Sequence, residues 1–178
     1  MATISVLMPV YNGEKYIKET IDSVLNQTFE NFEFIIVNDG STDNTKNIIE
    51  SYKDNRIKLY NLDRNMGVGY ASNFAVNKAK GKYVARADSD DIYHPDRLLL
   101  QKRFLDDNPD IALAKTFVEY FGDENTRKTE RYNTIKTITE RNKNDFMTPE
   151  EISQELYFQS CIPHTTIMIR TEVMKKFG

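Results

Sequence analysis

Residues 83–91 are Tyr-Val-Ala-Arg-Ala-Asp-Ser-Asp-Asp, a short apolar run that leads directly into three carboxylates. The run at 83–87 has the length and composition of a buried strand. Three carboxylates within four residues repel one another unless a cation neutralises them. The stretch therefore predicts a strand that ends in a chemically active loop, and it sets the pattern for the rest of the chain.

The same unit, an apolar run followed by a loop and a helical segment, recurs upstream. Strands are predicted at 4–8, 32–37, 57–60 and 83–87. Helices, recognised by apolar residues at helical spacing, are predicted at 15–26, 43–52, 70–80 and 95–107. Strands that alternate with helices at this spacing favour right-handed βαβ units and a mostly parallel sheet. We therefore predict an α/β, Rossmann-like fold in which ligands bind outside the carboxyl ends of the strands.

The second half of the chain has a less regular pattern. Its predicted elements are a strand at 111–120, a polar excursion at 122–145, a short helix at 149–156, a strand at 165–170 and the start of a helix at 171–177. The chain shows no internal repeat and no low-complexity linker. We predict a single domain over residues 1–178.

The composition excludes several classes of protein. The chain has 178 residues, 39% of them hydrophobic and 29% charged, and a net charge of -3, so it has no basic field that would hold nucleic acid or an anionic membrane. Cys161 is its only cysteine, which excludes an intrachain disulfide and a Cys-rich zinc site. The longest apolar runs have the length of strands, which predicts no membrane-spanning helix. The N-terminus has no secretion signal, so we expect a cytoplasmic location.

The acidic cluster after the fourth strand is the strongest chemical signal. Asp88, Asp90 and Asp91 offer the hard oxygen ligands that Mg²⁺ or Mn²⁺ prefers. Ions of the magnesium type are commonly shared between one or two carboxylates and the phosphates of a substrate, so a nucleoside diphosphate is the natural companion. The alternative is a solvated acidic turn that caps the following helix.

Two further polar segments follow predicted strands. The second strand leads into Asn-Asp-Gly-Ser-Thr-Asp at 38–43. The glycine permits a left-handed backbone. Asp39 can accept hydrogen bonds from a base or a ribose, and Ser41 or Asp43 can cap the next helix. The first strand leads into Pro-Val-Tyr-Asn, in which Tyr11 can either offer an aromatic face to a nucleobase or simply pack within the loop.

In this order and spacing, the segments at 9–12, 38–43 and 88–91 resemble the motifs of the family 2 glycosyltransferases, which have the GT-A fold. The resemblance runs from Ile4 to Gln101 and resumes weakly in Cys-Ile-Pro-His-Thr-Thr at 161–166. No single motif decides the assignment, whereas the three together are highly specific.

For the nucleotide, the resemblance implies that Tyr11 and Asp39 hold the nucleobase, usually uracil, in a pocket that Pro9 shapes. One position departs from the family pattern. Many members carry an arginine in the helix after the glycine loop, where this chain has Ala-Ser-Asn at 71–73. Arg86 lies two residues before the first carboxylate and shares its face of the strand. It either replaces the missing contact to the nucleotide or pairs with a carboxylate.

For the metal and the sugar, the resemblance implies that Asp90 coordinates a Mn²⁺ or Mg²⁺ ion that bridges the diphosphate. Asp88 would face the ribose or the diphosphate, or share that ion, and Asp91 would either lie near the donor sugar or act as a structural cap. The ion would stabilise the charge that develops on the departing nucleoside diphosphate.

The family inverts the anomeric centre, which requires a general base opposite the leaving group. The resemblance places that base in a later segment, so we expect it beyond Gly178. The chain is then a nucleotide-binding half at 1–101 with a partial acceptor-side half at 102–178, truncated at its C-terminus. The implied donor is a UDP-sugar, and the implied acceptor is a saccharide or a lipid-linked molecule in bacterial-type surface polysaccharide synthesis. Such an enzyme would act in the cytoplasm, either free or at the inner face of the membrane.

Three other functions fit parts of the pattern. A sugar-nucleotide-binding module without catalysis would share every feature of the donor site. A metal-dependent phosphohydrolase would use Asp88 as nucleophile and Asp90 as acid, but it would leave Tyr11 and the segment at 38–43 without a role. A phospho-acceptor domain of flavodoxin type would need an acidic pair after the first strand, where this chain has Tyr-Asn.

Overall fold

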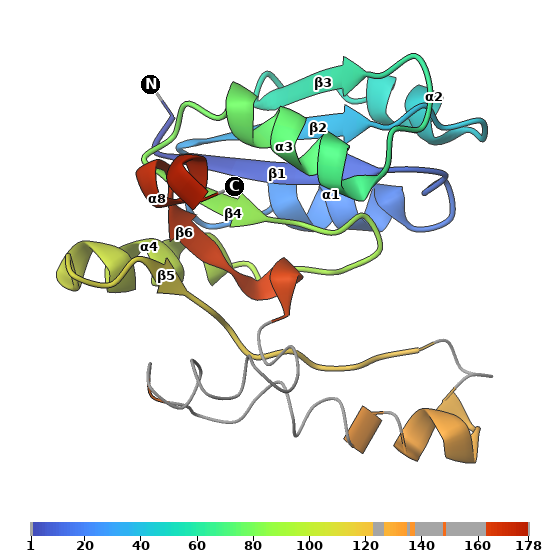
Figure 1. The fold of residues 1–178 in the computed structure, drawn as a ribbon. Helices are drawn as coiled ribbons and strands as arrows, with labels where there is room; N and C mark the ends of the chain where they lie inside the picture. The colour runs from blue at the N-terminus through green and yellow to red at the C-terminus, as the bar shows by residue number, and fades with distance from the viewer. Residues whose placement is uncertain (1, 123–126, 135, 138–147, 149–162, 178) are drawn as a thin grey trace.

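The computed structural model describes residues 2–122, 127–134, 136–137, 148 and 163–177. Its centre is a six-stranded sheet with the order β3-β2-β1-β4-β6-β5 (Figure 1). The strands are β1 (Ile4–Val10), β2 (Phe32–Asn38), β3 (Ile57–Asn61), β4 (Tyr83–Arg86), β5 (Leu113–Ala114) and β6 (Met168–Arg170). The strands from β3 to β4 are parallel, whereas β6 runs antiparallel to both of its neighbours. The predicted α/β class and mostly parallel sheet are confirmed.

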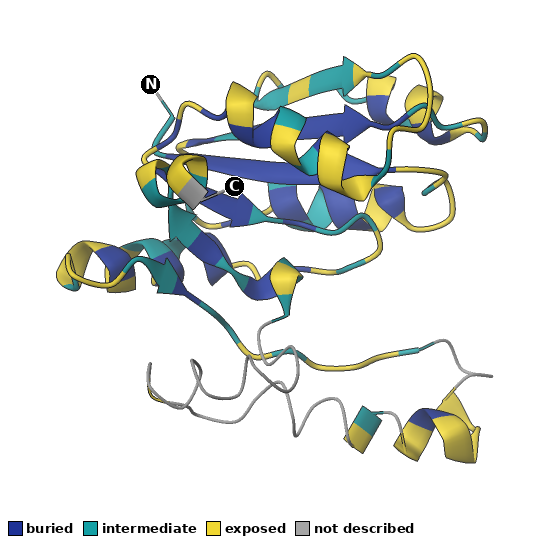
Figure 2. Ribbon diagram, in the orientation of Figure 1, coloured by how far each residue is buried: buried dark blue, intermediate teal, exposed yellow. Residues whose placement is uncertain are grey.

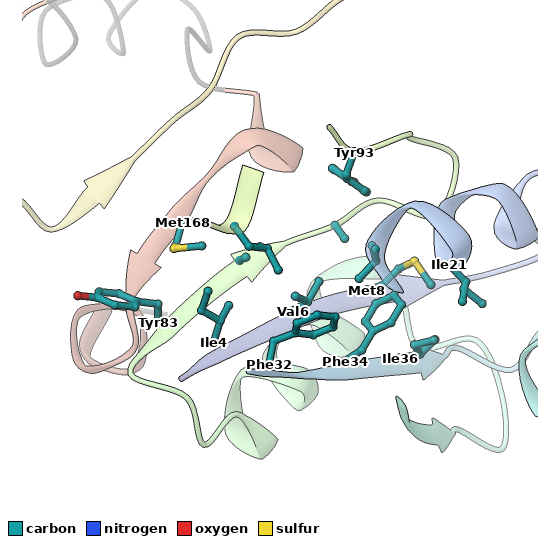
Figure 3. Close-up of a cluster of buried hydrophobic side chains, with 14 of the residues drawn as sticks. Ile4, Val6, Met8, Ile21, Phe32, Phe34, Ile36, Tyr83, Tyr93 and Met168 are labelled. Atoms are coloured by element: carbon teal, nitrogen blue, oxygen red, sulfur yellow. The ribbon is translucent and has the colours of Figure 1, made fainter. Parts of the chain in front are cut away.

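Helices cover both faces of this sheet. Figure 1 labels α1 (Ile17–Leu25), α2 (Thr45–Glu50), α3 (Val68–Lys78), α4 (Arg97–Asp107) and α8 (Thr171–Phe177). A 3-10 turn, η1 (His164–Thr166), precedes β6. In Figure 1, α3 lies in front of the sheet and α1 behind it. Because successive side chains of a strand point to opposite faces, Val6 and Met8 of β1 join Ile21 of α1 in one cluster (Figure 3). Leu7 joins Ala71 of α3 in the other. The central strands are therefore buried between two helical layers (Figure 2).

β1 continues past its predicted end. The sequence predicts a strand that stops before Pro9, but β1 extends to Val10, and Pro9 pairs with Val37 of β2. The carbonyl of Leu7 accepts the Ala87 amide from the β4 side. In a strand, the N–H and C=O groups of alternate residues face the same neighbouring strand. The nitrogen of Pro9 therefore also faces the β4 side, but it lies beyond Leu7 and Arg86, the last pair between β1 and β4. Its missing N–H therefore removes no bond from the sheet.

The second half departs further from the predicted pattern. The strand predicted at 111–120 is wrong in its length, since only Leu113–Ala114 pair with β6. A segment of high β propensity needs a neighbouring strand, and the structure places none beside the described residues that follow β5. The strand predicted at 165–170 begins only at Met168, because η1 occupies the residues before it.

Other predictions for the second half are not tested by the described residues. The helix at 149–156 and most of the excursion at 122–145 fall outside them. The division of the domain at residue 101 stays a prediction as well. Within the described part of the chain, none of the helices combines the length and the apolar character needed to cross a membrane.

An ion-pair cluster near the end of α4 links stability to pH. The Asp106 carboxylate accepts hydrogen bonds from Lys102 at 2.6 Å, from Lys82 at 2.7 Å and from the Tyr83 hydroxyl at 2.6 Å. These donors, Lys102 first, hold the pKa of Asp106 well below its usual range. A carboxyl whose pKa is lower in the folded state stabilises the fold fully above its unfolded pKa of about 4. That stabilisation is lost as the pH falls towards the folded pKa.

We expect Asp106→Asn to lower the free energy of unfolding by about 1 kcal/mol at neutral pH, because the pairs are partly exposed to solvent. The difference from wild type should shrink as the pH falls below about 4, because the Asp106 carboxyl of the unfolded wild-type chain then takes up a proton before that of the folded chain does. Urea denaturation at neutral and acidic pH measures this difference. Asp107→Asn, at the exposed neighbouring position, is the matched control. A deficit of the same size at both pH values would contradict the prediction.

Candidate functional site

The order of the strands marks the edge at which a ligand site is expected. From β1 the chain moves outward to β2 and β3, and it then returns to place β4 on the other side of β1. The sheet therefore has a topological switch point between β1 and β4, where open α/β sheets bind ligands at the carboxyl ends of the strands. Tyr11 follows β1 at this edge, Asp39 follows β2, and Asp88 follows β4. The fold thus brings together the three segments singled out in the sequence.

Hydrogen bonds join the loops that follow β1 and β2. The Asn12 amide donates to the Ser41 hydroxyl at 3.0 Å, and the Gly13 amide donates to Thr45 Oγ1 at 2.8 Å. Of the two predicted caps of α2, Ser41 is therefore engaged with the other loop. Asp43 does act at the helix start, since its Oδ1 accepts the Thr45 amide at 3.0 Å. The two loops form one connected surface beside the switch point.

Asp39 fixes a third loop to this surface. Asp39 is buried, with only 3% of its surface exposed to solvent. Its carboxylate accepts the amides of Met66 at 2.8 Å and Gly67 at 2.9 Å, one on each oxygen. This role in holding the entry to α3 was not anticipated from the sequence. Each oxygen keeps a further lone pair, so the carboxylate can still accept a bond from a ligand. Tyr11, in contrast, is 48% exposed and presents its ring as a stacking surface.

Gly40 allows the loops after β2 and β3 to pack against each other. Its φ of 68° lies in the left-handed region, which confirms the backbone predicted from the sequence. A Cβ at this position would lie 2.4 Å from the carbonyl carbon of Arg64 and 2.6 Å from the amide nitrogen of Asn65. No side chain fits between the two backbones.

Arg86 connects the acidic loop to α3. Its Nε donates to Asp88 Oδ1 at 2.9 Å, and its Nη1 donates to the Ser72 hydroxyl at 2.7 Å. The sequence leaves open whether Arg86 pairs with a carboxylate or supplies the cation that is missing at 71–73. The structure shows the pairing with Asp88. The guanidinium also touches α3 at Ser72, within the segment that lacks an arginine, and its contact to a nucleotide stays a prediction.

The three carboxylates after β4 have different surroundings. Asp88 is paired with the arginine, and its amide donates to the Tyr93 hydroxyl at 2.7 Å. Asp90 is exposed, and no described residue donates a hydrogen bond to its carboxylate. Burial raises the pKa of Asp91, and the nearby charges of Asp88 and Asp90 also raise it, against a hydrogen bond with Thr165 that lowers it.

This set of donors fits a divalent cation that is shared with phosphate. Within the described residues, no three acidic, histidine or cysteine side chains gather closely enough to hold a metal by themselves. Asp90 and the Oδ2 of Asp88 nevertheless supply two hard ligands, since Arg86 engages only Oδ1. Ions of the magnesium type are commonly held by one or two carboxylates together with substrate phosphates.

Three residues that support the acidic loop, Tyr93, Arg97 and Thr165, were missed in the sequence. The Tyr93 hydroxyl lies 2.7 Å from Thr165 Oγ1, and Arg97 donates to the Arg86 carbonyl at 2.8 Å. Thr165 belongs to the segment at 161–166, whose weak resemblance to the family was the available signal. Tyr93 and Arg97 carry no comparable signal in the sequence, because they are only an aromatic residue and a cation near the start of a helix.

The model of the family named Glycosyl transferase family 2 matches residues 5–178. This chain belongs to glycosyl transferase family 2. The match includes the three loop segments at the switch point, and it confirms the family predicted from them.

Two curated proteins illustrate the relatives of this family 2 chain. The uncharacterized glycosyltransferase MJ1057 of Methanocaldococcus jannaschii is 38% identical over 177 residues, which cover 97% of this chain and 57% of that protein. The putative teichuronic acid biosynthesis glycosyltransferase TuaG of Bacillus subtilis is 43% identical over 104 residues, which cover 57% of this chain and 41% of TuaG. The match spans only about half the length of each of these two relatives.

Solved structures of glycosyltransferases have the same fold. The crystal structure of S. aureus TarS matches with a TM-score of 0.71 and 28% identity, covering 99% of this chain and 49% of that one. TarS in complex with UDP or UDP-GlcNAc matches with a TM-score of 0.69. The mannosyltransferase PcManGT of Pyrobaculum calidifontis, in complex with GDP-Man and Mn²⁺, has a TM-score of 0.71 at 21% identity, which shows a likeness of fold alone; it covers 99% of this chain and 46% of that one. The predicted GT-A fold is confirmed.

A cavity of about 820 Å³ opens beside the acidic loop of this family 2 chain. Asp91 and Thr165 contribute polar atoms to its lining, whereas Leu100, Phe117 and Phe121 contribute apolar surface. Its volume lies within the range of small-molecule sites, about 300–1,000 Å³. Asp91 therefore belongs both to the acidic loop and to a space that can receive a ligand.

Proposed function

We propose that this protein transfers a sugar from a nucleotide-diphosphate donor, namely a UDP-sugar, to a saccharide or lipid-linked acceptor, with inversion and with Mn²⁺ or Mg²⁺. The observation that carries the proposal is the gathering of Tyr11, Asp39, Asp88 and Asp90 around the switch point between β1 and β4. An exposed ring, a buried hydrogen-bond acceptor and two hard carboxylates are suited to a nucleobase and a metal-bound diphosphate.

Two relatives support the choice of donor and pathway. TarS, which is 28% identical to this chain, has been crystallised with UDP and with UDP-GlcNAc. TuaG carries a name that assigns it to teichuronic acid biosynthesis. These names favour a uridine donor and a part in bacterial-type surface polysaccharide synthesis.

Residues of β1, β2 and β4 would hold the nucleotide. In the proposed complex, Tyr11 stacks on the base, and Asp39 accepts a hydrogen bond from the base or the ribose through a lone pair that the loop amides leave unused. Pro9 shapes the pocket at the end of β1. Arg86 supplies a positive charge near the diphosphate, at the place where many members of the family use an arginine from the helix.

The acidic loop would hold the metal and face the sugar. Asp90 and the Oδ2 of Asp88 are the proposed ligands of the ion. When bound, the ion neutralises the charge that develops on the departing nucleoside diphosphate. Asp91 lines the cavity beside the loop, so we place the donor sugar against it. The general base is not assigned to a residue of this chain.

The rival functions fit the site less well. A phosphohydrolase would need Asp88 as a free nucleophile, whereas Arg86 is paired with that carboxylate at 2.9 Å. A phospho-acceptor domain would leave Tyr11 and Asp39 without a role. A binding module without catalysis would use the same donor site, and an assay of sugar transfer separates it from the proposal.

Calorimetric titration with UDP, with and without Mn²⁺, tests the donor site directly. We expect the chain to bind UDP, and Mn²⁺ to tighten this binding by about 5–150-fold, the usual range for two coupled ligands. GDP is the comparison nucleotide and is expected to bind more weakly. A folded chain that binds neither nucleotide in either condition would contradict the proposal, and preference for GDP would overturn the choice of uridine.

A further inference from the structure

Arg97 has a position that the proposed donor site does not explain. It is the first residue of α4, six positions after Asp91 in the chain, and it is only 6% exposed. A buried charge is unfavourable unless it is paired and hydrogen-bonded. In the described ranges of the chain, no carboxylate lies within ion-pair distance of its guanidinium. Its partners must therefore be found elsewhere.

Those partners are the backbone carbonyls of two separate segments and one neighbouring side chain. Arg97 Nη2 donates to the carbonyl of Arg86 at 2.8 Å and to that of Ile167 at 3.1 Å, and its Nε donates to Gln101 Oε1 at 3.1 Å. Gln101, one turn later in α4, donates to a carbonyl in β5 at 3.0 Å and to one in η1 at 2.7 Å. Together the two side chains join the end of β4, which carries the acidic loop, to β5 and to the segment before β6.

Arg97 also supports the acidic loop through Tyr93. The guanidinium carbon lies 4.7 Å from the centre of the Tyr93 ring. The hydroxyl of that ring accepts the Asp88 amide at 2.7 Å and lies 2.7 Å from Thr165 Oγ1. Both routes from Arg97, through the Arg86 carbonyl and through Tyr93, lead to the backbone at the start of the acidic loop.

We propose that Arg97 is a positioning residue that holds residues 88–91 in the geometry that receives the divalent metal of the donor complex. The inference rests on the proposed function. Groups behind the direct ligands of a metal commonly set its affinity by orienting those ligands, and losing one typically costs about 10–100-fold in affinity. Because Arg97 is itself a cation, its contribution comes from the geometry that it imposes and not from attraction to the metal.

Arg97→Lys separates geometry from charge, because lysine keeps the positive charge but lacks the planar fork that reaches two carbonyls. The measurement is titration of Mn²⁺ into the chain at saturating UDP, together with titration of UDP in the absence of metal. We expect the Mn²⁺ affinity to fall about tenfold or more. The metal-free affinity for UDP should change much less than the Mn²⁺ affinity, since the proposed contacts to the base lie on the loops after β1 and β2. Arg97 touches Arg86, the proposed diphosphate contact, only at its backbone carbonyl. Arg103→Lys, at an exposed position of the same helix, is the matched control.

Tyr93→Phe provides a second and smaller perturbation. It keeps the ring against Arg97 and removes only the hydroxyl that accepts the Asp88 amide. We expect the same selective loss of Mn²⁺ affinity. If Arg97→Lys does not fold, Tyr93→Phe decides the matter, because a wild-type Mn²⁺ affinity in that variant overturns the inference and a selective loss supports it.

Two results with a folded Arg97→Lys variant would overturn the inference. One is a Mn²⁺ affinity equal to that of wild type. The other is a parallel fall in Mn²⁺ affinity, metal-free UDP affinity and thermal midpoint, which would show that Arg97 only stabilises the fold. A wild-type chain that binds no UDP in either condition would contradict the proposed function instead, so the two failures are distinguishable.

Discussion

The Asp90→Asn variant is expected to lose the effect of Mn²⁺ on UDP binding while it keeps the weaker, metal-free affinity for UDP. Asp90 is exposed and receives no hydrogen bond from the described residues, so the substitution breaks none of their contacts. Asparagine has nearly the same shape but no charge, which makes it a poor ligand for a hard cation. Because an outer-shell group already contributes about 10–100-fold to metal affinity, the loss of a direct ligand should cost about 100-fold or more.

The same calorimetric titrations measure this loss, and Asp110→Asn is the matched control. Asp110 is an exposed aspartate between α4 and β5, beyond the end of α4 that is remote from the acidic loop. Its substitution changes the net charge by the same amount and should leave the Mn²⁺ effect intact. Equal losses in both variants would indicate a general effect of charge. An undiminished Mn²⁺ effect in Asp90→Asn would remove Asp90 from the proposed ligands.

The first half of the fold could be predicted because its information is local. The strands predicted at 32–37, 57–60 and 83–87 differ from the observed ones by at most one residue at either end. Each is a short apolar run with its own helix nearby, so patterns within a few residues suffice. The edge of the sheet at which the site lies could be predicted from the same information, since the carboxyl ends of parallel strands meet on one side of a sheet.

The rest depends on contacts between residues that are far apart in the chain. Tyr93 and Thr165 meet across 72 positions, and Asp39 reaches the Met66 amide across 27. No local sequence pattern indicates that the Asp39 carboxylate, predicted to bind a nucleobase, also accepts hydrogen bonds from two amides of another loop. The strand predicted at 111–120 failed for a related reason, because β propensity does not specify whether a neighbouring strand is present.

Gly40→Ala is expected to cause the largest loss of stability among these single substitutions. An L-residue in the left-handed region, at the observed φ of 68°, costs roughly 1–2 kcal/mol. The new Cβ would also approach the Arg64 backbone to 2.4 Å, and such overpacking typically costs about 1–3 kcal/mol. Since the obstacle is backbone, it cannot rotate away as a side chain would. We expect the free energy of unfolding to fall by roughly 2–5 kcal/mol.

Gly69→Ala is the matched control for this change, and urea denaturation compares the two variants. Gly69 lies within α3, its φ is not positive, and its Cβ would meet nothing within 4 Å. Alanine is the better helix former by about 1 kcal/mol, so this variant should equal or exceed the wild type in stability. Similar stabilities for the two variants would contradict the close packing of the loops after β2 and β3. Asp39 precedes Gly40 and holds the loop after β3 through the amides of Met66 and Gly67. A shift of the backbone at residue 40 in Gly40→Ala should therefore also weaken metal-free UDP binding.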